Sequence, residues 1–268
     1  MDVTIAFMTN YTLDIPNIIK QKDTIESFYK IFKPNGNIEI NIFCDEKPLS
    51  KIEGGFTLFN GDRYNDYKIP GDEYIKKLKE IDYFKDAKII KTKSLCDGYI
   101  KAVNMCKTNY LFFLEHDWLF LDNINHTIND LVKFLDNNKE INCILFNKIR
   151  NSPLNWQTIT PLRKEIPICL TNRQSNNPNI LRISHAKEIR LPLIKPEGCS
   201  VHKEVQFYKM PGFNLPHSCG GIECELSEWC NSKEKVNILG TVIYGRKGYN
   251  PTVVHSDGCD RDYLNKFT

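Results

Sequence analysis

The chain has 268 residues, of which 36 are Lys or Arg and 33 are Asp or Glu, so its formal charge is only +3. The hydrophobic fraction of 41% and the charged fraction of 26% are those of a globular protein, which excludes a disordered or fibrous chain. A charge this small, without a long basic run, argues against a nucleic-acid or anionic-membrane partner.

Strand and helix patterns alternate along the first half of the chain. Apolar runs and alternation predict strands at Val3–Met8, Ile38–Phe43, Ala87–Lys91, Tyr110–Leu114 and Cys143–Phe146. Helical spacing and stop residues predict helices at Ile18–Phe32, Asp72–Leu78, Asp97–Cys106 and His126–Leu135. This alternation predicts an α/β fold, with a mostly parallel central sheet flanked by helices.

The rest of the chain is harder to divide into elements. Glu53–Pro70 is rich in Gly, Asp, Asn and Tyr and has the composition of an irregular insertion. After residue 150 the pattern loosens, and we predict only two short strands, at Asn237–Ile243 and Thr252–Val254. No repeat and no linker interrupts the sequence, so we expect a single domain with an elaborated C-terminal half.

The N-terminus and the ten cysteines bear on the cellular compartment. The segment MDVTIAFMTN has no basic region and no long apolar stretch, so it predicts a first strand rather than a signal peptide. No apolar run approaches the roughly 20 residues of a membrane helix. We therefore expect a soluble, cytoplasmic protein with free thiols. A zinc site is the alternative role for the cysteines, although no C-x-x-C pair occurs; its candidate ligands are His217, Cys219, Cys224 and Cys230.

Polar residues follow the predicted strands at their carboxyl ends, where ligands bind in open α/β sheets. Thr9 follows the first strand, Asp45 follows the second, and Glu115-His116-Asp117 follows the apolar strand at Tyr110–Leu114. Two carboxylates at the end of a buried strand are costly unless they are compensated, and a divalent cation that carries a nucleotide diphosphate would compensate them. The structural alternative is a strand-end carboxylate that caps the following helix.

The run SLCDGYIKAVNMCKTNYLFFLEHDWLFL, which contains this motif, resembles the core of glycosyltransferases of the A-type (GT-A) fold. In that family a glycine-containing helix with a basic residue and an Asn precedes an apolar strand that ends in an acidic D-x-D motif. The resemblance covers about residues 1–147. It implies a single GT-A-like domain over residues 1–268, with a nucleotide-binding half at 1–147 and an acceptor-binding half at 148–268.

The resemblance also implies roles for individual residues in the nucleotide-binding half. Asp97 and Lys101 match the positions that face the nucleotide base, and Glu115-His116-Asp117 occupies the D-x-D position. The first carboxylate is Glu rather than Asp, so Asp117 is the surer metal ligand. The remaining two matches are Asp45, which would hold the nucleoside, and Thr9, the first-strand contact.

The segment HSCGGIECELSEW resembles the one that supplies the general base in inverting members of the family. Glu223 or Glu225 would then deprotonate the acceptor hydroxyl, and we prefer Glu223 because it follows the Gly220-Gly221 turn. Cys224 stands where many relatives have Asp. The alternative is that both are solvated acids in the first turn of a helix, favoured by its dipole.

A further resemblance lies near the C-terminus, in the segment NPTVVHSDG. Here His255 matches a third metal ligand or a diphosphate contact, with Asp257 as the substitute. The loop TNRQSNNPNILRISHA offers Arg173, Asn177 and Arg182 to the donor sugar or its diphosphate, or is ordinary surface.

Together these features predict a metal-dependent glycosyltransferase. It would use Mn²⁺ or Mg²⁺ and a nucleotide-diphosphate sugar, UDP being favoured by the fold, and transfer the sugar with inversion to a hydroxyl on a glycan or protein acceptor. A sugar-nucleotidyltransferase is one alternative, although the first loop TNYTLDIP lacks the expected Gly and basic residues. The others are a non-catalytic carbohydrate-binding or partner-binding protein and a viral type of DNA-modifying sugar transferase.

Overall fold

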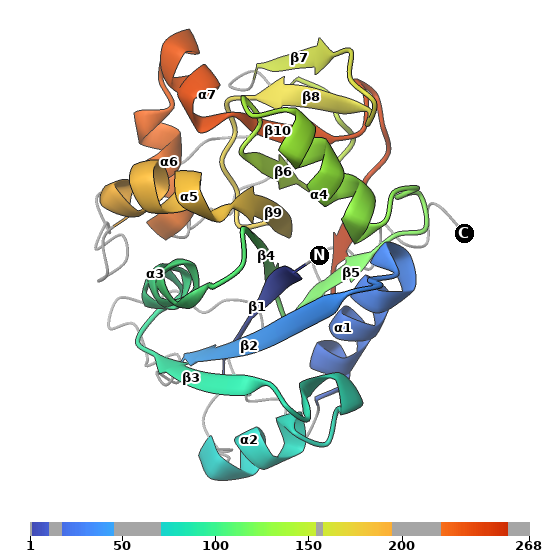
Figure 1. Ribbon diagram of the computed structural model, residues 1–268, viewed down its shortest axis with the longest axis vertical. Coiled ribbons are helices and arrows are strands. Elements are labelled where there is room, and N and C mark those ends of the chain that lie inside the picture. The colour runs from blue at the N-terminus through green and yellow to red at the C-terminus, as the bar shows by residue number, and fades with distance from the viewer. Residues whose placement is uncertain (1, 11–17, 46–70, 154–157, 195–220, 257–268) are drawn as a thin grey trace, which may run out of the picture.

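The computed structural model describes residues 2–10, 18–45, 71–153, 158–194 and 221–256 (Figure 1). In this part of the chain nine strands form one large sheet, in the order β3-β2-β1-β4-β9-β6-β10-β8-β7. Their bounds are β1 Asp2–Asn10, β2 Asn37–Asp45, β3 Lys88–Thr92, β4 Tyr110–Glu115, β6 Cys143–Leu145, β7 Ile159–Leu162, β8 Ile168–Thr171, β9 Asn179–Arg182 and β10 Thr241–Tyr244. A separate antiparallel pair is formed by β5, Trp118–Phe120, and β11, Val253–His255.

The helices lie between and beside these strands. The α-helices are α1 Ile19–Phe32, α2 Gly71–Leu78, α3 Leu95–Met105, α4 Ile128–Asn137, α5 Ile183–His185, α6 Gly221–Trp229 and α7 Lys233–Leu239. The short helical turns are η1 Asp82–Phe84, η2 Ala186–Arg190 and η3 Leu191–Leu193. Among the described residues, none of these helices has both the length and the apolar character needed to cross a membrane.

The directions of the strands confirm the predicted α/β fold. The strands β3, β2, β1 and β4 are parallel neighbours, and β6 is parallel to β10. Only β9 and β8 run against the other strands of the large sheet, because each pairs antiparallel with both of its neighbours. The sheet is therefore mostly parallel, and it continues without a break from the first half of the sequence into the second.

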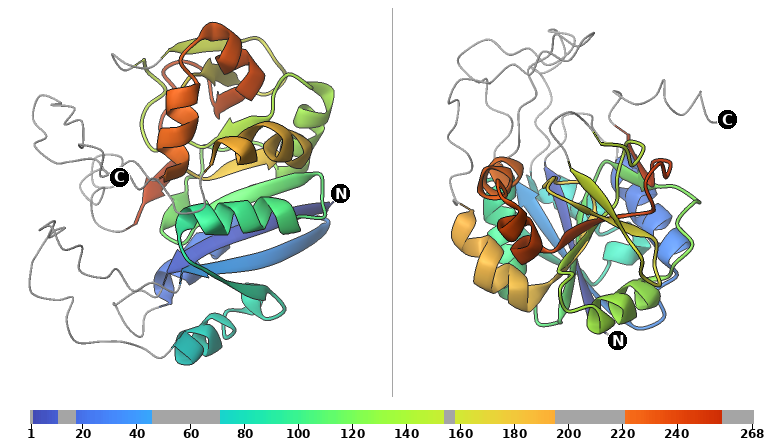
Figure 2. Two further views of the ribbon diagram at one scale, coloured as in Figure 1. Left: turned by 90° about the vertical axis from the view of Figure 1, so that its left-hand side faces the viewer. Right: turned by 90° about the horizontal axis from the view of Figure 1, so that it is seen from above.

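Alternation along the central strands divides the core into two layers. In β1, Val3, Ile5 and Phe7 pack with α1 and α4 on one face of the sheet. Ala6 and Met8 point to the other face, where α3, η2 and α6 cover the sheet (Figure 2). A strand buried on both faces reads as a continuous apolar run, which is why the sequence alone located it.

One predicted strand, Asn237–Ile243, is wrong in its first half. Residues up to Leu239 belong to α7, which Ser232 caps by accepting the backbone N–H of Lys235. The helix ends at Gly240, whose φ of +54° is left-handed, and β10 begins only at Thr241. The apolar β-branched residues of this short helix resemble a strand, whereas the signals of a helix were its N-cap serine and terminal glycine.

Replacing Gly240 with Ala should destabilise the protein by at least about 2 kcal/mol. A Cβ at this left-handed position would lie 2.2 Å from the backbone oxygen of Glu140, so the chain would have to shift. The control is Gly248→Ala, because Gly248 also has a positive φ but no atom within 4 Å of the added Cβ. Urea unfolding should therefore give a clearly larger loss for Gly240→Ala, and equal losses would contradict the steric argument.

The cysteines of the described part are buried as free thiols. Those with a described side chain are Cys44, Cys96, Cys106, Cys143, Cys169 and Cys230. His217 and Cys219 lie outside the described residues, as do the insertion Glu53–Pro70 and the side chain of Cys224, so the zinc alternative stays a prediction.

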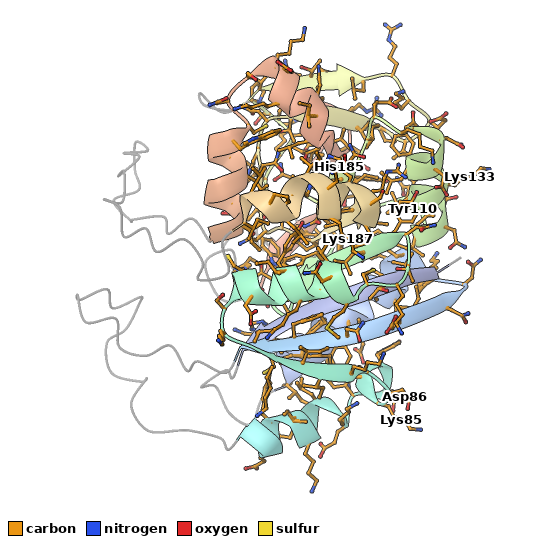
Figure 3. The ribbon with its side chains drawn as sticks, turned by 60° about the vertical axis from the view of Figure 1, so that its left-hand side comes forward. Lys85, Asp86, Tyr110, Lys133, His185 and Lys187 are labelled. Atoms are coloured by element: carbon orange, nitrogen blue, oxygen red, sulfur yellow. The ribbon has the colours of Figure 1, made fainter. Side chains whose placement is uncertain are left out.

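His185 should make stability fall in mild acid. It lies on the helical segment α5–η2, which also carries Lys187 (Figure 3), and its Nε2 donates to the carbonyl oxygen of Ile238 at 2.9 Å. Burial, aided by the charge of Arg190, lowers the pKa of His185 to about 4. In the unfolded chain the pKa of this histidine is near 6.5, so the unfolded state takes up a proton before the folded state does. The contribution of neutral His185 to the free energy of unfolding is therefore complete above about pH 6.5 and is lost as the pH falls toward 4. Because the ring is partly exposed to solvent, we expect this contribution to the free energy of unfolding to be about 1–2 kcal/mol.

The measurement is the free energy of unfolding of the protein and of His185→Gln between pH 7 and pH 4.5. The difference between the two should shrink as the pH falls. A difference that stays constant with pH would show that His185 does not titrate in this range.

Candidate functional site

The register of the sheet brings the predicted strand-end residues to one edge. Asn10 at the end of β1 pairs with Asp45 at the end of β2, and Asp45 pairs in turn with Thr92 at the end of β3. On the other side of β1, Met8 pairs with Glu115 at the end of β4. The carboxyl ends of four parallel strands thus form one continuous edge, as the sequence predicted.

Asp117 meets His255 at this edge. Its carboxylate Oδ2 lies 3.1 Å from His255 Nε2, and the side chains are only 13% and 22% exposed. The second oxygen, Oδ1, is buried and has no hydrogen-bond partner among the described residues. Burial by itself raises the pKa of Asp117, but the hydrogen bond from His255 and the nearby imidazole of His116 outweigh it and hold that pKa below its usual value.

The β5–β11 ribbon makes this meeting possible. His255 pairs with Trp118, the residue that follows Asp117, and the backbone N–H of Ser256 donates to the carbonyl oxygen of Asp117 at 2.7 Å. Trp118 is buried, and its ring lies 4.5 Å from the His255 ring in an edge-on arrangement. Trp118 therefore packs against the His255 ring as its cross-strand neighbour, and Lys148 Nζ lies over the same indole, 5.7 Å from the ring centroid.

The other strand-end residues occupy different environments along the same edge. Glu115 is half-buried as the last residue of β4. Thr9 is buried, with its hydroxyl 2.6 Å from the hydroxyl of Tyr74, which also accepts a hydrogen bond from Gln21 Nε2 at 3.0 Å. Tyr74 and Gln21 could not be predicted from the sequence, because no local pattern shows that α2 and α1 reach the end of β1. The side chain of Asp45 lies outside the described part of the structure.

Asp97 and Lys101 are joined to each other at the start of α3. Lys101 Nζ lies 2.8 Å from Asp97 Oδ2 and also donates to the carbonyl oxygen of Lys91 at 2.9 Å. The same carboxylate oxygen accepts the backbone N–H of Lys93 at 2.9 Å. Burial by itself raises the pKa of Asp97, but the hydrogen bonds from Lys101 and Lys93 outweigh it and hold that pKa low. The pair thus fixes the turn between β3 and α3, at the predicted edge.

Glu223 is held at the start of α6 by the segment that precedes β9. Its Oε1 accepts the hydroxyl of Ser175 at 2.8 Å and the backbone N–H of Asn176 at 2.7 Å. These two hydrogen bonds use the same oxygen, which orients the carboxylate. Burial lowers the pKa of the neighbouring Arg173, and the charge of Glu223 opposes that shift. The side chain of Glu225 and all of Asp257 lie outside the described residues.

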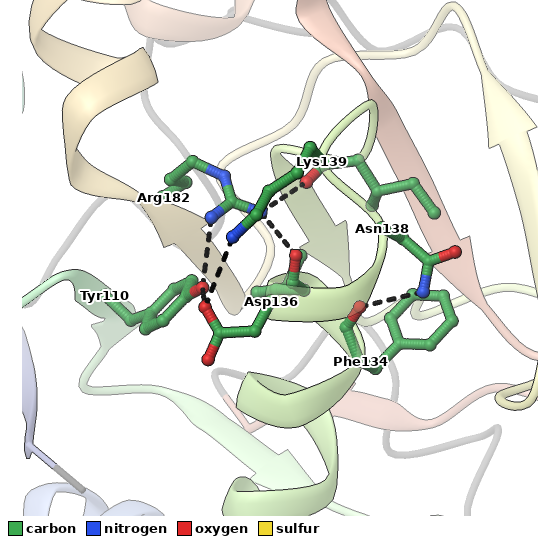
Figure 4. A network of polar contacts seen from close by, with 8 residues as sticks. Tyr110, Phe134, Asp136, Asn138, Lys139 and Arg182 are labelled. Atoms are coloured by element: carbon green, nitrogen blue, oxygen red, sulfur yellow. Dashed lines mark hydrogen bonds and ion pairs between the residues drawn. The ribbon is translucent and has the colours of Figure 1, made fainter.

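The prediction that Arg182 contacts the donor is wrong, because Arg182 lies beside the amino-terminal end of β4, at the opposite end of the strand from Glu115. It pairs with Tyr110, the first residue of β4, and its Nη1 donates to the Tyr110 hydroxyl at 3.0 Å (Figure 4). The same guanidinium donates to the carbonyl oxygens of Leu135 and Ile141. Burial and the hydrogen bond to Asp136 raise the pKa of Tyr110 to about 12. This network joins α4 to the sheet and serves the fold.

At the end of β4 the structure brings together two groups that can donate electron pairs to a cation, the carboxylate of Asp117 and the imidazole of His255. No group of three or more His, Cys, Asp or Glu side chains converges in the described part of the structure. Asp117 and His255 nevertheless fit a divalent cation, because a buried carboxylate oxygen lacks a partner and imidazole nitrogen is a suitable companion ligand.

Comparison with known proteins gave structural similarities alone: no protein-family model and no curated relative matches the chain. The chain is similar to TarS residues 1–349 from S. aureus, with 12% identity and a TM-score of 0.48 over 92% of this chain and 59% of that one. It is similar to mouse xyloside xylosyltransferase 1, with 9% identity and a TM-score of 0.46 over 96% and 98% of the chains. It is also similar to CMP:2-keto-3-deoxy-manno-octonic acid synthetase complexed with CTP, with 10% identity and a TM-score of 0.44 over 100% and 98%. The chain spans less than two thirds of the TarS fragment, and likeness at these values does not establish an activity.

Proposed function

We propose that this protein is a glycosyltransferase that moves a sugar from a nucleotide-diphosphate donor to an acceptor hydroxyl. Residues 1–147 would bind the nucleotide and residues 148–268 would bind the acceptor. The proposal rests on the D-x-D-like motif and its order among the other motifs, together with the placement of these residues along one sheet edge.

The observation that carries the proposal is the buried carboxylate of Asp117. One of its oxygens faces His255 at 3.1 Å, and the other is buried without a hydrogen-bond partner among the described residues. A buried carboxylate oxygen without a partner is costly in a purely structural role, because its lost hydration is not replaced. A bound cation at this position would replace it.

Asp117 and His255 would hold Mn²⁺ or Mg²⁺ together with the donor diphosphate. When bound, the cation supplies positive charge that stabilises the diphosphate as it leaves. The two protein ligands are fixed in place before binding, since the β5–β11 ribbon and the Trp118 ring set the position of His255. The rest of the donor would lie along the edge toward Asp45, Asp97 and Lys101.

Strand spacing sets the reach of that edge. The ends of β4 and β3 are three strand spacings apart, which is about 14 Å, so a nucleotide can extend from Asp117 toward the start of α3. Thr9, at the end of β1, lies between these two positions. The Asp97–Lys101 pair would present its outer surface to the base, with its geometry already set by the contacts of α3 and β3.

Glu223 would act as the general base. In a single displacement the acceptor oxygen forms a bond to the anomeric carbon, the bond from that carbon to the diphosphate breaks, and the hydroxyl proton passes to Glu223. The contacts from Ser175 and Asn176 to one carboxylate oxygen leave the other to accept this proton. Attack opposite to the leaving diphosphate inverts the anomeric configuration.

A panel of nucleotide sugars tests the proposal. The Tm of the protein would be measured with UDP-, GDP-, dTDP- and CMP-sugars, each with and without Mn²⁺. We expect one nucleotide to raise the Tm by several degrees, and only with metal, because a ligand at 100 times its Kd adds about 2.7 kcal/mol. If no nucleotide raises the Tm under either condition, the transferase proposal fails and a non-catalytic binding protein becomes the better description.

A further inference from the structure

A polar cavity lies on the face of the sheet that α3 and α6 cover, next to η2. Its volume of about 10 Å³ gives room for one water-sized species. The cavity is lined mainly by polar side chains from α3, η2, the segment before β9 and the first residue of β9: Tyr99, Gln174, Ser175, Asn176, Asn179 and Arg190.

Arg190 brings a positive charge to this cavity. It is only 4% exposed, and its Nη2 donates to the hydroxyl of Thr241 at 2.8 Å. No carboxylate lies within ion-pair distance of it in the described part of the chain. Burial by itself lowers the pKa of Arg190, but the neighbouring Cys143 thiol and Tyr99 hydroxyl outweigh it, so the guanidinium stays protonated. A buried cation without a counter-charge is expensive.

Three hydrogen-bond donors on the cavity residues have no acceptor at full hydrogen-bond distance among the described residues, although the Cys230 thiol lies near the Gln174 amide and Tyr99 and Cys143 lie near the Arg190 guanidinium. These donors are Arg190 Nε, the Tyr99 hydroxyl and Gln174 Nε2, and all three atoms are buried. The orientation of the Gln174 amide follows from its other contact, since its Oε1 accepts the Thr241 hydroxyl at 3.2 Å. The amide nitrogen is thus the end left without a partner. Buried donors of this kind are rare, and three around one small cavity require an acceptor.

We propose that this cavity binds one small anion of the halide class, held by Arg190, Tyr99 and Gln174. A halide ion accepts several hydrogen bonds at once and supplies the negative charge that the buried guanidinium lacks. The opposing feature is the buried amide oxygen of Asn176, which also has no partner and which only a donor would satisfy. A water molecule is therefore the competing occupant, but it leaves the charge of Arg190 uncompensated.

The cavity shares a wall with the residues that hold Glu223. Ser175 and Asn176 line it and also donate the two hydrogen bonds to Glu223 Oε1. An anion seated there would fix this segment, and with it the direction of the carboxylate. This consequence rests on the proposed function, whereas binding of the anion does not.

Halide binding is tested directly on the free protein. The Tm would be followed in sodium bromide and in sodium gluconate at equal ionic strength, and crystals soaked in bromide would be examined for anomalous scattering. We expect a saturable bromide-specific rise in Tm of several degrees and an anomalous peak in the cavity beside Arg190. Tyr99→Phe keeps the ring and removes one donor, so it should weaken bromide binding by about fivefold to tenfold. Tyr83→Phe, at an exposed tyrosine, should leave it unchanged.

Arg190→Gln should abolish the bromide effect, and Tyr99→Phe keeps the test valid if that variant does not fold. Equal Tm values in bromide and gluconate, with no anomalous peak, would mean that the cavity holds water, and this would overturn the proposal. Because no donor or acceptor sugar enters these measurements, their result is independent of the nucleotide-sugar panel. A halide that binds without changing the rate of sugar transfer would overturn only the link to Glu223.

Discussion

Asp117→Asn is expected to abolish metal-dependent nucleotide binding and to lower sugar transfer by at least about 10³-fold. The substitution keeps the shape of the side chain but removes the negative charge that would hold the cation. Stabilisation of a leaving diphosphate by a cation is worth several kcal/mol, and each 1.4 kcal/mol is a factor of ten in rate. The measurements are the Mn²⁺-dependent Tm shift with the nucleotide identified by the panel and the initial rate of transfer.

Two comparisons separate a metal ligand from a structural carboxylate. Asp122→Asn is the matched control, because Asp122 follows the same motif but is 76% exposed in a surface ion pair with Lys30. It should leave both measurements unchanged. In addition, Asp117→Asn without ligands should unfold at a slightly lower temperature than the natural protein, since the contact with His255 that keeps the pKa of Asp117 low is weakened. A large fall in that temperature with intact nucleotide binding would show that Asp117 serves only the fold.

Glu223→Gln is expected to lower kcat by about 10²- to 10⁴-fold while leaving donor binding intact. The amide oxygen of Gln can accept the same hydrogen bonds from Ser175 and Asn176, so the side chain should keep its place. It cannot accept the hydroxyl proton of the acceptor. The measurements are steady-state kinetics for both substrates and the Tm shift with donor.

The matched control is Glu234→Gln, because Glu234 is also a first-turn acid of a helix, at the exposed start of α7. Its kinetics should not change. If Glu225→Gln has the large effect and Glu223→Gln does not, the base is Glu225. The anomeric configuration of the first product, read by NMR, should be opposite to that of the donor, and retention would contradict the single displacement.

The fold of the first half was predictable because local patterns there agree with the tertiary structure. The run Tyr110–Leu114 is apolar throughout and Val3–Met8 is apolar except for Thr4, and the structure buries both on the two faces of the sheet. In the second half the strands are four residues or fewer, as in β8 and β9, and such short segments carry no clear period. Tertiary pairing, rather than local sequence, decides where they lie.

The same contrast holds for the candidate site. The sequence shows which residues end a strand, so it correctly predicted that Thr9, Asp45 and Glu115 lie at the carboxyl ends of parallel strands. Which side chains touch does not follow from the sequence, because contacts depend on distant segments. The ion pair between Asp97 and Lys101 has helical i,i+4 spacing and could have been predicted. The hydrogen bonds from Ser175 and Asn176 to Glu223 could not, because these residues are far apart in the sequence.

The pairing of β5 with β11 has a consequence for the order in which the protein is assembled. Asp117 and His255 are 138 positions apart, and the ribbon that joins them closes a long loop. Chains are synthesised from the N-terminus, so the strand that ends in Asp45 and the β4–β5 turn that carries Asp117 leave the ribosome well before the strand that carries His255. A nascent chain can therefore form the shared edge of strand ends while the Asp117–His255 pair is still incomplete. The pair forms only when β11, the last described strand, docks on β5, so under the proposed function the site becomes active only as the fold is completed.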